Sequence, residues 1–291
     1  MSEMPSKALL QDARFIDLHA HSTASDGTHA PAAVVAAARA AGLAAVALTD
    51  HDSLAGIGEA REAGLSLGVR IICGVELSAT EGERETHVLG LHISHPAEIE
   101  SHLAIFRASR RERAERIVQT LNSIGVYLSL ESVLEVANGA AIGRPHIAKA
   151  MIASGWARDI RDAFDRYLGN GRPAYVAKYR LGMADAIQLI HQAGGLAFLA
   201  HPGTDGTRAR LETLATMGLD GVEVRHPGHH AHDTARLGTL VDHFGMLPTG
   251  GSDWHGSADG PRALGCMRIP YQWLERHDAR LEEGCQRGMV A

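Results

Sequence analysis

The sequence predicts an α/β protein, a (β/α) barrel of about seven strands interrupted by a small all-helical insertion. Short apolar segments alternate with helical segments in residues 1–96, and the same alternation returns in residues 180–291. Between them, residues 97–179 show only helical patterns. Histidine and carboxylate residues follow the ends of several apolar segments, where a barrel places its active site. We therefore expect a barrel formed by the two outer ranges and a helical insertion between them.

The expected strands are short and apolar, as strands buried on both faces of a sheet are. They cover residues 15–18, 43–49, 69–75, 87–93, 196–200, 221–224 and 247–249. The segment between the third and fourth strands, SATEGERET, is too short and polar for a crossover helix. It predicts an antiparallel hairpin that brings His87 near Glu76.

The expected helices follow most of these strands and fill the insertion. They cover residues 31–41, 57–63, 99–124, 130–137, 145–153, 160–168, 184–193, 209–217 and 233–244. Gly42 is a suitable C-cap for the first helix, and Pro145 fits the first turn of its helix. The tail from Pro270 onward predicts a closing helix.

Composition restricts the classes of function. The 291 residues are 45% hydrophobic and carry a net charge of −6, so no global positive field attracts nucleic acid or a membrane. Three cysteines without a C-x-x-C pair favour reduced thiols in a cytoplasmic protein. No segment resembles a signal peptide or a membrane span. We expect a cytoplasmic protein without membrane association or an obligate protein partner.

The stretch FIDLHAHSTASDG, residues 15–27, contains the first candidate metal ligands. His19 and His21 lie two residues apart at a strand end, so both imidazoles point to the same side. Asp26 follows five residues later. An H-x-H pair alone is common among buried histidines, but here similar residues recur at later strand ends. This recurrence favours a divalent-metal site.

Nine residues form the candidate ligand set, and all are imidazole or carboxylate donors. They are His19, His21, Asp26, His51, Glu76, His87, His201, Asp253 and His255. Nine donors are too many for one ion and suit two or three ions that share a bridging carboxylate. Donors of this kind without thiolate suit Mn²⁺, Zn²⁺ or Fe²⁺ better than Ca²⁺.

Closely spaced ions of this kind suit phosphoester hydrolysis. They hold a hydroxide at neutral pH and stabilise the entering and leaving oxygens of an in-line displacement. Hydrolysis of an amide or lactam on a similar barrel is the alternative. The sequence has no lysine at a strand end suited to a bridging carbamate, which argues against that alternative.

Five short motifs resemble the PHP family of phosphoesterases (polymerase and histidinol phosphatase) in order and spacing. They are HAHS…SDG, TDHD, GVE, AHP and GSDWH, and the resemblance covers nearly the whole chain. It implies a distorted seven-stranded barrel of PHP type with a trinuclear centre. We expect Mn²⁺ as the metal, with Zn²⁺ or Fe²⁺ as alternatives. The resemblance assigns the first ion to His19, His21, Glu76 and Asp253. It assigns the second ion to Glu76, His87 and His201, and the third to Asp26, His51 and His255.

The insertion further resembles the subgroup that acts on 3′,5′-bisphosphonucleosides such as pAp and on short RNA ends. The segments ASRRERAERI and IGRPHIA carry this resemblance. The substrate-binding residues expected from it are Arg110, Arg111, Arg113, Arg144 and Glu76. A metal-bound hydroxide, without a protein nucleophile, would release the 3′-phosphate, and His229 is the candidate general acid. Arginine suits substrate binding because its guanidinium can donate two parallel hydrogen bonds to two phosphate oxygens.

Structural roles compete with several of these assignments. Arg111 and Arg116 have glutamates four residues away, as on a solvated helix face. Arg144 and His146 could cap or anchor a helix, and Asp50 and Asp52 could orient ligands or cap the next helix. We interpret Glu223 as a residue that supports a metal ligand rather than as a ligand itself. The histidines that remain, His226 among them, are interpreted as structural or surface residues.

Two other functions stay open from the sequence. The first is a histidinol-phosphate phosphatase, although an amine substrate would favour an acidic subsite over the arginines of the insertion. The second is a non-catalytic metal-binding regulatory module. The complete set of candidate ligands argues against this module, because it favours an active metal centre.

Overall fold

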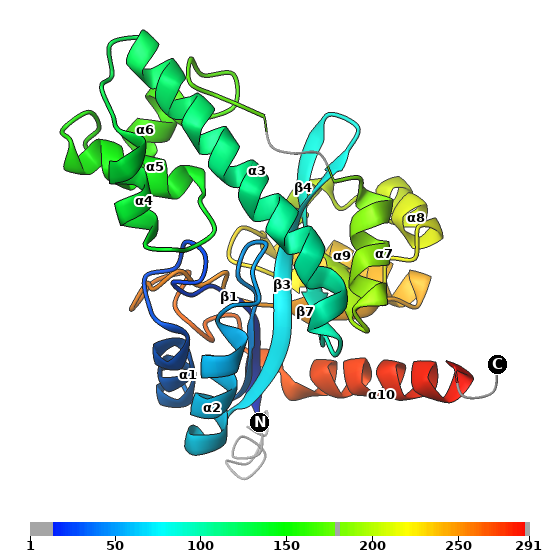
Figure 1. Ribbon diagram of the computed structural model, residues 1–291. Coiled ribbons are helices and arrows are strands. Elements are labelled where there is room, and N and C mark those ends of the chain that lie inside the picture. Colours follow the sequence, from blue (N-terminus) through cyan, green and yellow to red (C-terminus); the bar gives the residue numbers. More distant parts are fainter. Residues whose placement is uncertain (1–13, 178–180, 289–291) are drawn as a thin grey trace, which may run out of the picture.

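The computed structural model describes residues 14–177 and 181–288, and its strands form one nearly closed, barrel-shaped sheet (Figure 1). The strand order is β7-β6-β5-β4-β3-β2-β1-β8. The strands are β1 (Phe15–Ala20), β2 (Leu43–Leu48), β3 (Arg70–Glu81), β4 (Arg84–Leu91), β5 (Leu196–Leu199), β6 (Gly221–Arg225), β7 (Leu247–Gly250) and β8 (Ile269–Pro270). The predicted α/β barrel is confirmed.

The sheet mixes parallel and antiparallel pairs. Strands β1, β2 and β3 are parallel to one another, as are β5, β6 and β7. Strands β3 and β4 form the predicted antiparallel hairpin, in which Ser78 lies opposite His87. Glu76 lies two residues from Ser78 and therefore shares the face that carries His87.

The sheet has eight strands where seven were expected. The additional strand, β8, has only two residues and pairs antiparallel with Phe15 and Ile16 of β1. Two residues are too few to show an alternating or apolar pattern. This pairing depends on the long connection after β7, which returns the chain to the barrel.

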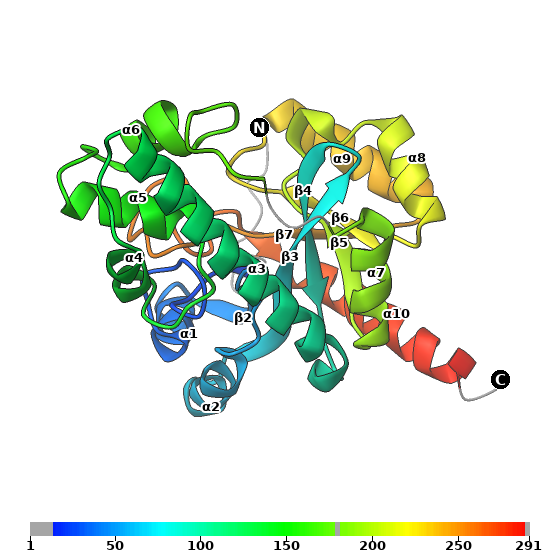
Figure 2. The same ribbon diagram turned by 45° about the horizontal axis from the view of Figure 1, so that its top comes forward.

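Helices cover the outer face of the sheet (Figure 2). They are α1 (Pro31–Ala40), α2 (Ile57–Leu67), α7 (Met183–Gln192), α8 (Arg208–Thr216) and α9 (Ala231–Phe244), whereas α10 (Tyr271–Gly288) lies below the sheet in the view of Figure 1. One hydrophobic cluster lies between the helices and the sheet, and a second, with Leu18 and Phe198, fills the interior. Leu274 of α10 packs against this interior cluster.

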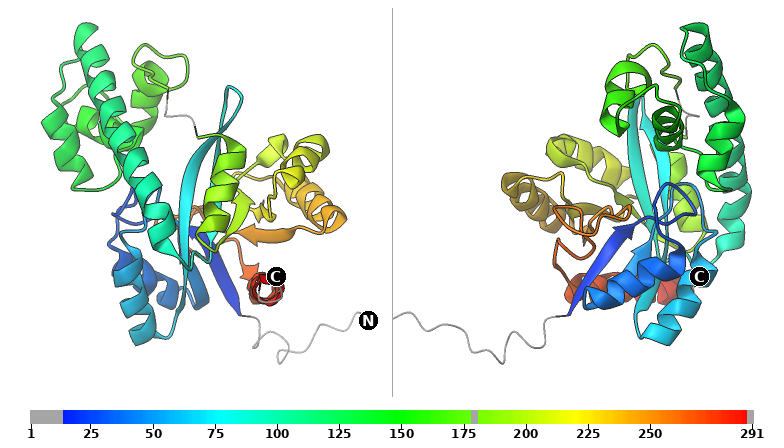
Figure 3. Two further views of the ribbon diagram at one scale, coloured as in Figure 1. Left: turned by 45° about the vertical axis from the view of Figure 1, so that its right-hand side comes forward. Right: turned by 90° about the vertical axis from the view of Figure 1, so that its left-hand side faces the viewer.

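The helices between β4 and α7 form a third hydrophobic cluster. They are α3 (Pro96–Ser123), α4 (Leu130–Ala137), α5 (Arg144–Ala153), α6 (Ile160–Ala163) and a π-helix (Phe164–Leu168). The first half of α3 packs on the barrel through Ile99 and Leu103, whereas Ile117 and Leu121 pack with Ile147 of α5. Helices α4, α5 and α6 lie at the end of the molecule opposite α10 (Figures 1 and 3).

The expected helices are all present, with ends shifted by a few residues. The helix expected over residues 160–168 divides into an α-helical and a π-helical turn. Among the residues that the structure describes, no helix is long and apolar enough to cross a membrane.

Candidate metal centre

The nine candidate ligands converge at one end of the barrel, where the parallel strands have their C-terminal ends and the antiparallel β4 has its N-terminal half. His19 lies in β1, Glu76 in β3 and His87 in β4, and the others lie on loops that follow strands. Glu76 is at the centre of the group and is only 1% exposed. Burial opposes ionisation of Glu76, yet His51, His87 and His19 hold the pKa of its carboxyl well below the usual value. The sequence thus encodes one carboxylate surrounded by imidazoles.

The first group of donor atoms has the dimensions of a four-ligand cage. His19 Nε2 and His21 Nε2 are 3.2 Å apart. His19 Nε2 lies 3.4 Å from Glu76 Oε2 and 3.5 Å from Asp253 Oδ1, and His21 Nε2 lies 3.3 Å from each of these oxygens. Four ligands held about 2.1 Å from one ion in a tetrahedron lie about 3.4 Å from one another. The donor set therefore fits a divalent ion.

The second group lies around the other oxygen of Glu76. His87 Nδ1 lies 2.8 Å from Glu76 Oε1, and His201 Nε2 lies 3.1 Å from the same oxygen. The two ring nitrogens are 3.3 Å apart. Glu76 thus directs one carboxylate oxygen to each of the two groups.

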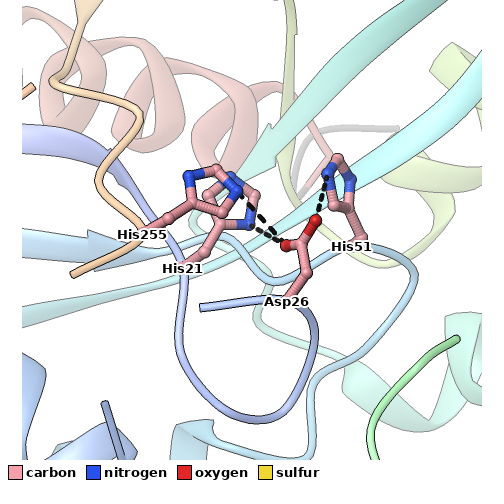
Figure 4. A group of neighbouring side chains, drawn as sticks. All are labelled: His21, Asp26, His51 and His255. Carbon is pink, nitrogen blue, oxygen red and sulfur yellow. Dashed lines mark ion pairs between the residues drawn. The ribbon is translucent and has the colours of Figure 1, made fainter. Parts of the chain in front are cut away.

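The third group is centred on Asp26, which lies between three imidazoles (Figure 4). His255 Nε2 is 3.2 Å from Asp26 Oδ1, while His51 Nε2 and His21 Nδ1 are each 3.9 Å from an Asp26 oxygen. His51 also directs Nδ1 to Glu76 Oε2 at 3.2 Å, and this buried nitrogen has no hydrogen-bond partner in the described residues. His51 therefore lies between this group and the groups around Glu76.

A second layer of carboxylates orients these ligands. Glu223 Oε1 accepts a hydrogen bond of 3.0 Å from His19 Nδ1, so Nε2 of His19 presents its lone pair to the first group. Glu223 Oε2 accepts from the backbone N–H of His201 at 2.6 Å. Asp50 accepts bonds from Ser22 and Ser25 in the loop that carries Asp26. This supporting role was predicted for Glu223 and weighed for Asp50.

Sequence reasoning missed three residues of the centre. Asp17 is fully buried and accepts backbone hydrogen bonds from His19, Ser252 and Gly265, which joins β1 to the segment after β7. A lone aspartate inside an apolar strand is the signal that could have identified it. His226 and Arg262 both contact Asp253 Oδ2, and their surroundings in the sequence have no comparable pattern.

The predicted substrate arginines lie in different environments. Arg110 is nearly buried; its Nε donates to Asp52 Oδ2 at 2.6 Å, and its other nitrogens reach Ile142 O and Ser78 Oγ. Arg113 is 4% exposed and donates to Val176 O. Arg111 pairs with Glu115 on the solvent side of α3, as its structural role suggests.

Arg144 and His146 anchor α5. Arg144 donates to Leu168 O and Asn170 Oδ1, each at 3.2 Å, and lies 3.8 Å from Glu85. His146 is buried, and its Nδ1 accepts from the backbone N–H of Gly143. Both residues thus have the structural contacts that were weighed for them.

A cavity of about 340 Å³ opens over Glu76, and Glu76, His229 and Arg262 are among its lining residues. His229 Nδ1 donates to Val224 O, and its Nε2 accepts from the backbone N–H of Gly203. Burial lowers the pKa of this imidazole. In this conformation His229 has no proton available for a leaving group, so its role as general acid stays a prediction without a supporting contact.

The sequence matches the family profile of the PHP domain over residues 17–232. The chain belongs to the PHP family. It is 35% identical to a 3′,5′-nucleoside bisphosphate phosphatase of Chromobacterium violaceum, over 86% of this chain and 90% of that protein. It is 34% identical to the 5′-3′ exoribonuclease Rnm of Escherichia coli, over 82% of this chain and 84% of that protein.

A solved structure has the same fold. It is described as a metal-dependent phosphoesterase from Bifidobacterium adolescentis, with a TM-score of 0.84 and 33% identity. The match covers 92% of this chain and 96% of the other. The PHP chain described here is therefore a metal-dependent phosphoesterase with a His, Asp and Glu cluster able to hold metal ions.

Proposed function

We propose that this protein removes the 3′-phosphate from 3′,5′-bisphosphonucleosides, converting pAp to AMP and phosphate, and that it also hydrolyses short RNA from the 5′ end. Nine imidazole and carboxylate donors converge, and six of them, Glu76 included, line one cavity; this convergence is the observation that carries the proposal. The names of the relatives from Chromobacterium violaceum and Escherichia coli support the substrate class.

The centre would hold two or three ions, and Mn²⁺ suits its donors best, with Zn²⁺ and Fe²⁺ as alternatives. The first group of residues would hold one ion, the pair around Glu76 Oε1 a second, and the Asp26 group a third. Bound ions would supply Lewis acidity toward phosphate oxygens and activation of a water. The residues of the chain itself fix the ligands in place, with Glu223 holding the His19 tautomer.

We assign residues 1–96 and 180–291 to the barrel and residues 97–179 to an insertion that contributes to substrate binding. Arg113 supports this assignment, because its buried Nη2 has no partner in the described part of the chain. Burial, followed by the neighbouring charge of Arg144, lowers the pKa of Arg113 to about 10. A phosphate beside Arg113 and Arg144 would offset the free-energy cost of burying the charge of Arg113. Arg110 and Arg111 already have carboxylate partners, so they contribute less to the proposal.

The test is phosphate release from pAp by protein reconstituted with Mn²⁺, beside chelated protein and beside histidinol phosphate. We expect Mn²⁺-dependent turnover of pAp, and a loss of at least about 100-fold in Asp26→Ala and His255→Ala. His102→Ala, an exposed change on α3, is the matched control and should retain activity.

Other outcomes would overturn the proposal. Turnover of histidinol phosphate alone would keep the metal centre and reject the nucleotide substrate. Metal binding without turnover of either substrate would favour a regulatory module. A cytoplasmic location stays a prediction from cysteine usage.

A further inference from the structure

Arg262 differs from the other residues that line the metal cavity. It lies on the segment between β7 and β8, and it is the one arginine or lysine among the described residues lining the cavity. This segment passes beside the loop after β1, where the backbone N–H of Thr28 donates to His255 O (Figures 1 and 2). A cavity lined mainly by imidazoles and by the carboxylates of Glu76 and Asp253 thus has a single arginine among its described lining residues.

The contacts of Arg262 leave most of its guanidinium open. Nη1 contacts Asp253 Oδ2 and lies 3.4 Å from Asp253 O. Nε and Nη2 have no hydrogen-bond partner in the part of the chain that the structure describes, and the side chain is 46% exposed. A half-exposed ion pair of this kind contributes little to stability. The open edge of the guanidinium has the geometry that binds two oxygens of a phosphate.

Asp253 does not depend on Arg262 for its orientation. Its Oδ1 faces His19 and His21, and its Oδ2 has a second donor, His226 Nε2, at 3.4 Å. The backbone N–H of Gly228 donates to His226 Nδ1 at 2.9 Å, which places the ring proton on Nε2. His226 is 4% exposed and fixed in position. If Arg262 moved away, Asp253 Oδ2 would still accept a hydrogen bond.

We propose that Arg262 binds the phosphoryl group of the substrate in the metal cavity, moving from Asp253 to two phosphate oxygens while His226 holds Asp253. This inference deepens the proposed function and rests on it for the substrate class, a phosphate monoester. Arginine stays charged at all working pH values, so it stabilises the negative charge of the phosphoryl group without a proton transfer.

The experiment compares Arg262→Gln, Arg262→Lys and Arg268→Gln with the unaltered protein. Arg268 lies on the same segment, but its guanidinium lies over the ring of Phe15, away from the cavity, which makes it the matched control. Calorimetry measures Mn²⁺ binding first, and then the binding of inorganic phosphate to the Mn²⁺-loaded protein. Steady-state kinetics with pAp follow.

For Arg262→Gln we expect phosphate to bind at least about tenfold more weakly and kcat/KM for pAp to fall about 100-fold, because one strong anion donor is lost. Arg262→Lys should recover part of both, since it keeps the charge but not the fork. Mn²⁺ affinity should stay within about threefold of the original value, because His226 still holds Asp253. Arg268→Gln should match the unaltered protein in all three measurements.

Two results would overturn the inference. Unchanged phosphate affinity in Arg262→Gln would show that the phosphoryl group does not contact this residue. A loss of Mn²⁺ affinity that accounts for the whole loss of activity would make Arg262 a support for Asp253 only. If the unaltered protein binds phosphate but does not hydrolyse pAp, the proposed function fails, while the phosphate titration still tests Arg262.

Discussion

At the scale of single residues, the centre depends on hydrogen bonds that fix each donor atom. The types and spacing of its ligands could be predicted because each follows a recognisable strand end. The partners of Asp17 could not be predicted, because Ser252 and Gly265 lie more than 200 residues away in the sequence. The contact of Arg262 with Asp253 could not be predicted either, because Arg262 lies on a loop without a pattern.

Glu223→Gln is expected to weaken Mn²⁺ binding by about 10–100-fold, because an amide holds the His19 tautomer less firmly than a carboxylate. Glu223 is fully buried and accepts from both His19 Nδ1 and the backbone of His201. Glu212→Gln, an exposed change on α8, is the control. Calorimetric titration with Mn²⁺ measures the effect, and equal affinities in the two variants would contradict it.

At the scale of elements, the hairpin and α3 determine how the two parts of the chain meet. The hairpin could be predicted because its connection is too short for a crossover helix. The attachment of α3 could not be predicted, because nothing in the sequence distinguishes Arg110 from the other arginines of the same helix. In the structure it joins α3 to Asp52, the residue after His51, and to Ser78 of β3.

Arg110→Ala should lower the free energy of unfolding by about 3 kcal/mol, because it leaves the buried carboxylate of Asp52 without its cation. The Arg110 and Asp52 side chains are 10% and 4% exposed. Arg111→Ala removes an exposed pair from the same helix and should cost less than about 1 kcal/mol. Urea denaturation of both variants gives the comparison, and similar losses would show that Arg110 is not a structural link.

At the scale of the whole molecule, the end of the barrel opposite the metal centre has a histidine pair of its own, the buried His277 and the half-buried His92. His277 of α10 donates from Nε2 to Pro248 O, and its Nδ1 lies 3.4 Å from His92 Nε2. Arg70, at the start of β3, forms two hydrogen bonds of 2.7 Å with Asp278 beside this pair. Burial lowers the pKa of His92 to about 4 and that of His277 to about 3.

This pair should make the protein less stable in acid. In the unfolded chain both imidazoles take up protons near pH 6.5, whereas in the folded protein they stay neutral until much lower pH. The neutral imidazoles make their full contribution to the free energy of unfolding above pH 6.5. This contribution is lost as the pH falls toward about 4, by up to about 3 kcal/mol for His92.

His92→Asn tests this expectation, because His92 has a positive φ of 63° that asparagine tolerates. We expect the free energy of unfolding of the variant to fall less between pH 7 and pH 4.5 than that of the unaltered protein. His102→Asn removes an exposed imidazole and should leave the pH dependence unchanged. Equal slopes in all three proteins would contradict the prediction.

The order of the candidate ligands along the sequence also has a consequence for the growing chain on the ribosome. Six of the nine candidate ligands lie within the first 87 residues, and the last two come after β7, at Asp253 and His255. At roughly 5–20 residues per second, translation of the intervening segment takes on the order of ten to thirty seconds. During that time the nascent chain carries an open cluster of imidazoles and carboxylates without Asp253. A chain that stops before residue 253 would therefore lack Asp253 of the first group and His255 of the Asp26 group.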